Sequence, residues 1–81
     1  MDKRTIFAYA KGVAVGNGTL TLDMKNKLDQ GDVELAIKIL NDRKDELRAG
    51  KYPQTVLPQS METIESMVAS VEEAVQELRK P

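Results

Sequence analysis

Apolar residues recur at alternating intervals of three and four over the last third of the chain, which is the spacing of one face of an α-helix. Pro58 stops any preceding element, Ser60 is a good N-cap, and Arg79 and Lys80 place positive charge at the far end. The stripe consists of Met61, Ile64, Val68, Val71, Val75 and Leu78. This pattern predicts a helix from Ser60 to Lys80.

A second helix is predicted between Asp32, a good N-cap, and Gly50, a good C-cap. Glu34 and Lys38 are spaced for an ion pair across one helical turn. The apolar face of this helix consists of Val33, Ala36, Ile37, Leu40 and Leu47, extended by Leu35 and Ile39. Residues 51–59 contain two prolines and therefore predict a loop, which is long enough for the two helices to run antiparallel.

Two structures fit the residues upstream of these helices. Thr21 can cap a short helix over residues 22–30. Before it, the alanine-rich composition favours another helix, whereas Asn17 and Gly18 are also typical of a tight β-hairpin turn. The helix would be capped by Asp2 and would bury Ile6, Tyr9, Ala10 and Val13. We prefer the helix and keep the hairpin as the alternative.

The predicted fold class is therefore all-α, with residues 1–81 forming a single small helical bundle. It is built on an antiparallel helical hairpin (Asp32–Gly50 and Ser60–Lys80), with one or two short N-terminal helices. The alternative is an α+β fold in which an N-terminal β-hairpin packs on the helices. A domain of this size buries only roughly 60% of its unfolded surface, so a partner subunit is expected.

Composition narrows the chemistry that the protein can perform. The chain is 41% apolar and 31% charged with a net charge of -1, and it has no cysteine, histidine or tryptophan. Disulfides, thiol chemistry and cysteine-based metal sites are therefore excluded, and no serine has a histidine to activate it. We expect a protein that is not an enzyme and that uses neither a cofactor nor a metal.

Three of the five glycines lie between Gly12 and Thr19, where a phosphate-binding loop is conceivable. A Walker loop needs Gly-Lys-Ser/Thr, but here Gly18 precedes Thr19 directly. Backbone amides without side-chain cover, together with nearby cations, can still bind an anion. The alternative prediction is therefore a protein that binds the phosphate of a nucleotide or nucleic acid. Its residues would be Gly16, Asn17, Gly18, Thr19, Arg43 and Lys44.

Cations gather toward the end of the helix that begins at Asp32. They are Arg43, Lys44, Arg48 and Lys51. Acidic residues are interspersed among these cations, so the net charge of this segment is too small to favour nucleic-acid binding. In an antiparallel hairpin they would lie beside the start of the last helix, where we expect them to pair with Glu62 and Glu65.

The function predicted by elimination is protein–protein interaction. The module would bind the surface of a partner protein, as small accessory or inhibitor proteins of phages and mobile elements do. The candidate partner-binding residues are Tyr52, Val56, Leu57 and Met67. The stripe from Met61 to Leu78 is expected to form the internal core. It would also form the seam of a homo-oligomer if it is wider than the facing helix can cover.

The apolar run that begins at Ile6 is too short for a targeting or membrane segment because Lys11 interrupts it. Neither a signal peptide nor a membrane span is predicted, and we expect a cytoplasmic protein.

Overall fold

Four helices make up most of the part of the chain that the structure describes. The computed structural model describes residues 2–50 and 61–81, with side chains in the second range from Ile64 onward. The helices are α1 (Lys3–Gly16), α2 (Leu22–Asp29), α3 (Val33–Arg48) and α4 (Met61–Arg79). No strand occurs in these ranges, so the all-α prediction is confirmed and the N-terminal β-hairpin is wrong.

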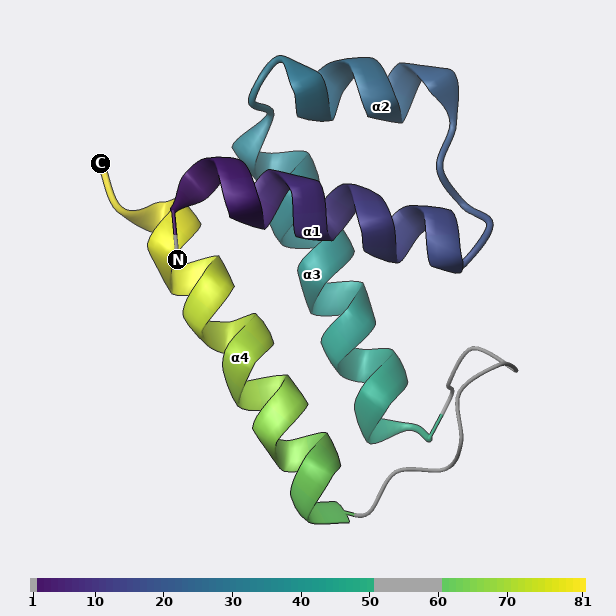
Figure 1. Ribbon diagram of the computed structural model, residues 1–81, viewed down its shortest axis with the longest axis vertical. Helices are drawn as coiled ribbons and strands as arrows, with labels where there is room; N and C mark the ends of the chain where they lie inside the picture. Colours follow the sequence, from purple (N-terminus) through teal and green to yellow (C-terminus); the bar gives the residue numbers. More distant parts are fainter. Residues whose placement is uncertain (1, 51–60) are drawn as a thin grey trace.

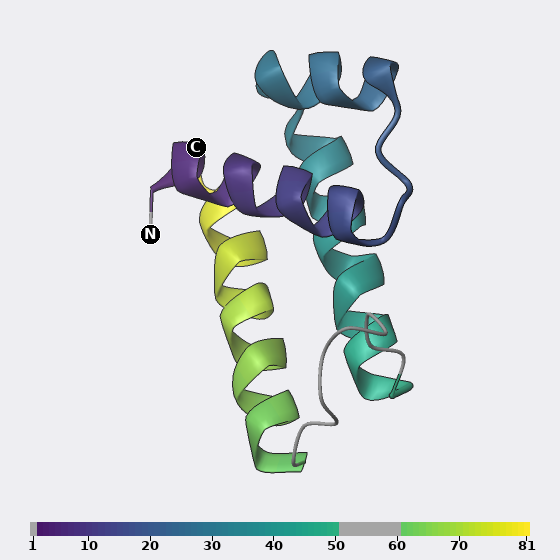
Figure 2. The ribbon, with the colours of Figure 1, turned by 45° about the vertical axis from the view of Figure 1, so that its right-hand side comes forward.

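The helices α3 and α4 lie side by side and antiparallel, and α1 crosses both of them (Figure 1). The short helix α2 packs beside α1 and against the first half of α3, as the turned view also shows (Figure 2). The two ends of the described chain meet, because the Lys3 ammonium donates a hydrogen bond of 2.8 Å to the Lys80 carbonyl.

Local capping sets the helix boundaries close to those predicted. Asp2, Thr21 and Asp32 each accept a hydrogen bond from the backbone amide three residues on, at 2.8, 3.1 and 3.0 Å. At the other end of α1, Gly18 has a φ of 68°, a conformation that side chains with a Cβ rarely adopt. These caps satisfy backbone groups that the helices themselves leave unpaired.

The core lies where α1 crosses the hairpin. Its buried residues include Ile6, Ala10, Ala14, Leu28, Ala36, Ile39, Leu40, Leu47, Val68, Val71, Ala74, Val75 and Leu78. The stripe of α4 from Val68 to Leu78 is thus buried against other helices of the same chain. This part of the stripe belongs to the internal core, which the sequence predicted as the other use of the stripe.

The buried face of α1 differs from the predicted one. Ile6 and Ala10 are buried as expected, but Ala14 completes the face, Tyr9 is 41% exposed and Val13 is half-buried. Alanine side chains allow α1 to lie close to α3 and α4, and this contact turns the bulkier tyrosine outward. The expectation that Tyr9 joins the core is wrong.

Two predicted ion-pair arrangements are also corrected. Lys38 pairs with Asp42 at 3.0 Å rather than with Glu34. Arg48 lies 3.1 Å and Lys44 3.9 Å from the carboxylate of Glu72, two turns beyond Glu65, while the side chain of the other predicted partner, Glu62, lies outside the described residues. The register between α3 and α4, which is set by their packed apolar faces, decides this pairing.

Candidate interaction surface

The side of α1 that faces away from the core is largely uncharged, with the exposed Arg4 at its border. Its residues, which we call the α1 face, are Thr5, Ala8, Tyr9, Gly12, Val15 and Gly16, and all of them are exposed. Their spacing of three and four places them on one side of the helix. Val15 is 60% exposed, and the outer side of a surface helix is ordinarily polar and charged. The α1 face therefore has the character of a surface that another molecule covers.

Gly12 lies at the centre of this face, and nothing in the described part of the chain explains a glycine there. Its φ lies outside the left-handed region, and no heavy atom comes within 4 Å of the place where a Cβ would stand. A glycine inside a helix costs about 0.5–1 kcal/mol relative to alanine. Ala8 and Gly16 continue the row one turn away on either side, and such small residues let a second helix approach closely.

A hollow of about 380 Å³ runs along one edge of the α1 face. It is lined by Tyr9, Gly12, Val13, Gly16, Asn17, Arg43 and Met67. Three helices contribute to it, since Arg43 belongs to α3 and Met67 to α4. The hollow has the volume of a small-ligand pocket. Its apolar side chains are Tyr9, Val13 and Met67, beside which a bulky apolar side chain fits, and its polar ones are Asn17 and Arg43.

Of the predicted partner-binding residues, only Met67 falls in the described part of the chain, where it lines this hollow. Tyr52, Val56 and Leu57 lie outside the described residues. The sequence analysis did not identify Tyr9 and Gly12 as surface residues. The signal in the sequence was the recurrence of uncharged residues at intervals of three and four from Thr5 to Gly16.

The residues of the phosphate-binding alternative are arranged unfavourably for an anion. The amides of Asn17, Gly18 and Thr19 donate to carbonyls in the last turn of α1 at 3.0, 3.0 and 2.9 Å. The Asn17 side-chain amide donates to the Glu46 carboxylate at 3.1 Å, so this amide is already engaged within the chain. The loop also follows the C-terminal end of α1, where the helix dipole is negative. This geometry weighs against phosphate binding, although Gly16, Asn17 and Arg43 do meet at the hollow.

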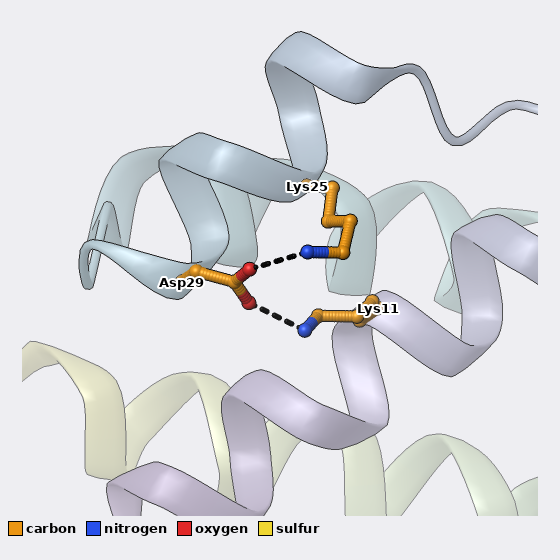
Figure 3. A network of polar contacts seen from close by, with 3 residues as sticks. All are labelled: Lys11, Lys25 and Asp29. Carbon is orange, nitrogen blue, oxygen red and sulfur yellow. Dashed lines mark hydrogen bonds and ion pairs between the residues drawn. The ribbon is translucent and has the colours of Figure 1, made fainter.

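Positive charge borders the α1 face on the side of α2. The Asp29 carboxylate accepts hydrogen bonds from Lys11 of α1 and Lys25 of α2, and it ties the two helices together (Figure 3). The hydrogen bond from Lys11, followed by that from Lys25, lowers the pKa of Asp29 below its ordinary value. Arg4 lines a second hollow, of about 410 Å³, with Lys11 and Asp29.

On the opposite edge, Arg43 lines the hollow beside the α1 face. Its side chain is only 12% exposed, and its buried Nε has no hydrogen-bond partner. Its guanidinium lies 3.9 Å from the Glu46 carboxylate, which is beyond hydrogen-bond distance. A buried donor without an acceptor is unfavourable, and the charge of Arg43 is balanced among the described residues only by Glu46 at 3.9 Å.

Comparison with protein-family models, curated proteins and solved structures found no match to the chain. None of the helices within residues 2–50 and 61–81 combines the length and the hydropathy that crossing a membrane requires. The same ranges hold no group of three or more side chains placed to bind a metal ion. We therefore infer a function from the surface of this chain itself.

Proposed function

We propose that this protein is a cofactor-free protein–protein interaction module that binds a partner protein through the α1 face. It acts as an accessory protein or an inhibitor by occupying the partner's surface, and we place its action in the cytoplasm, in keeping with a chain that has no cysteine. Docking of a helix on the α1 face would bury Tyr9 and Val15, which are otherwise exposed to water.

The observation that carries this proposal is Gly12. Among residues 2–50 and 61–81, the fold needs neither the backbone freedom of Gly12 nor its missing side chain, and a glycine inside α1 destabilises the helix. Close approach of another backbone is a reason for a glycine that does not depend on the chain's own packing. Tyr9 beside it belongs to a residue type that is enriched among the anchors of protein interfaces.

A capture experiment tests the proposal. The tagged protein and two variants are incubated with nuclease-treated lysate of the organism that makes it, and retained proteins are identified. Gly12→Leu fills the centre of the α1 face, and Gln76→Leu places the same side chain at an exposed position of α4 as a control. Thermal unfolding of each variant verifies that it is folded.

We expect one protein to be retained in stoichiometric amount by the wild type and by Gln76→Leu, and to be lost with Gly12→Leu. Equal retention by all three proteins would show that binding uses another surface. The absence of any retained protein, together with thermal stabilisation by inorganic phosphate, would instead favour the anion-binding alternative.

A further inference from the structure

The charges around the α1 face indicate what kind of partner fits it. The helix α1 contains Lys3, Arg4 and Lys11 and has no acidic residue. On the side of α2, two lysines share the single carboxylate of Asp29, so that this cluster has a net positive charge (Figure 3). Both edges of the face thus carry cations, since Arg43 borders the other one.

The edge at Arg43 is incompletely paired within the chain. Both oxygens of Glu46 accept from the Asn17 amide, at 3.3 and 3.1 Å, so this carboxylate is shared between two partners. The Arg43 guanidinium lines the hollow, and its Nε lacks an acceptor. The Nε itself is buried, so a carboxylate that entered the hollow from a bound molecule would form charge-assisted hydrogen bonds with the terminal nitrogens of this guanidinium.

We propose that the partner segment is an amphipathic helix with acidic side chains on both sides of its apolar stripe. Its backbone crosses close to Gly12, and a bulky apolar side chain enters the hollow between Tyr9 and Met67. Its carboxylates pair with Arg4 and Lys11 on one edge and with Arg43 on the other. This inference rests on the proposed function, because it specifies the occupant of the same face.

A second copy of this chain fits the face poorly. Pairing of two α1 helices would bring their cations together with no carboxylate from either helix. The outer side of α4 does carry carboxylates, but among its described side chains Ala69 is the only exposed apolar one. It offers no bulky group for the hollow. Charge and shape together therefore favour a different protein as the source of the helix.

The test uses two fluorescently labelled synthetic peptides with the same leucine and alanine stripe. One peptide has glutamates along both edges of the stripe, and the other has lysines at the same positions. Binding to the full chain is followed by fluorescence anisotropy at low and high salt. The variants are Gly12→Leu, which blocks the face, Arg4→Gln, which neutralises one edge, and the matched control Lys27→Gln on the side of α2 opposite Lys25.

We expect the glutamate peptide to bind at least roughly tenfold more tightly than the lysine peptide at low salt, and this ratio to shrink at high salt. Gly12→Leu should abolish the binding of the glutamate peptide. Arg4→Gln should weaken it by roughly threefold, as expected for the loss of one exposed ion pair, and Lys27→Gln should leave it unchanged.

Equal affinity for both peptides, lost in Gly12→Leu, would overturn the acidic partner while leaving the α1 face as a docking site. If neither peptide bound, the proposal of an acidic helical partner would also be overturned. The capture experiment would then decide the proposed function separately. Self-association in light scattering that disappears with Gly12→Leu would identify a second copy as the occupant.

Discussion

Replacing Gly12 with alanine should stabilise the isolated protein. The residue lies in the interior of α1, its φ lies outside the left-handed region, and a Cβ at this position would meet no atom within 4 Å. The added methyl group therefore causes no clash. It restricts the unfolded chain and improves the helix propensity of a position that the native structure already holds in a helix.

The expected gain is about 0.5–1 kcal/mol in the free energy of unfolding. For a domain of this size, such a gain raises the midpoint of thermal unfolding by about 2–8 °C. It also raises the midpoint of urea denaturation by a few tenths of a molar to about 1 M. Circular dichroism at the helical band follows both transitions.

Gly18→Ala is the matched comparison, since it introduces the same methyl group six residues further on. Gly18 has a φ of 68°, so alanine there is strained and should destabilise the protein by about 1 kcal/mol or more. If Gly12→Ala lowered stability as well, the chain itself would need this glycine, and the argument that it serves an external contact would fail.

Three further predictions concern the fold that holds the α1 face in place. Leu40→Ala, which empties a fully buried position, should cost about 2–5 kcal/mol in urea denaturation and leave little folded protein, whereas no loss would contradict its place in the core. Asp32→Ala removes the cap of α3 and should cost about 1 kcal/mol in the same assay, with Asp32→Asn as the control that retains a capping oxygen. Because its ion pairs lower the pKa of Asp29, the stabilisation it provides is fully present above the ordinary value of 3.8 and is lost as the pH falls through the lowered pKa. Thermal unfolding of wild type and Asp29→Asn should therefore differ at neutral pH and converge in acid, and a difference that is constant with pH would contradict the ion pairs.

The helices themselves were predictable from the sequence because their determinants are local. Asp32 caps α3 through the amide three residues on, and Gly18 ends α1 with a positive φ. The apolar residues of α3 and of α4 lie mainly on one side of each helix. Their spacing therefore also predicted which side is buried. The core residues Leu40 and Val71 are buried as their positions in these stripes predict.

The orientation of α1 was not predictable in the same way. Its residues are apolar on nearly every side, so their spacing does not decide which side meets the core. Packing against α3 and α4 makes that choice through Ala10 and Ala14, and Tyr9 is turned outward as a result. The site was correspondingly hard to predict. Met67 was identified, but the central Gly12 was interpreted only as part of a glycine-rich stretch.

Site-specific photo-crosslinking tests the central claim most directly. The photoreactive amino acid benzoylphenylalanine replaces Tyr9, whose side chain is 41% exposed at the edge of the α1 face, and in a control protein it replaces Gln76 on α4. Irradiation in the organism that makes the protein, followed by mass spectrometry, identifies the adducts. We expect a single protein to be crosslinked at position 9, through a helix with acidic flanks, and not at position 76. Crosslinking of that protein at position 76 alone would contradict a partner bound to the α1 face.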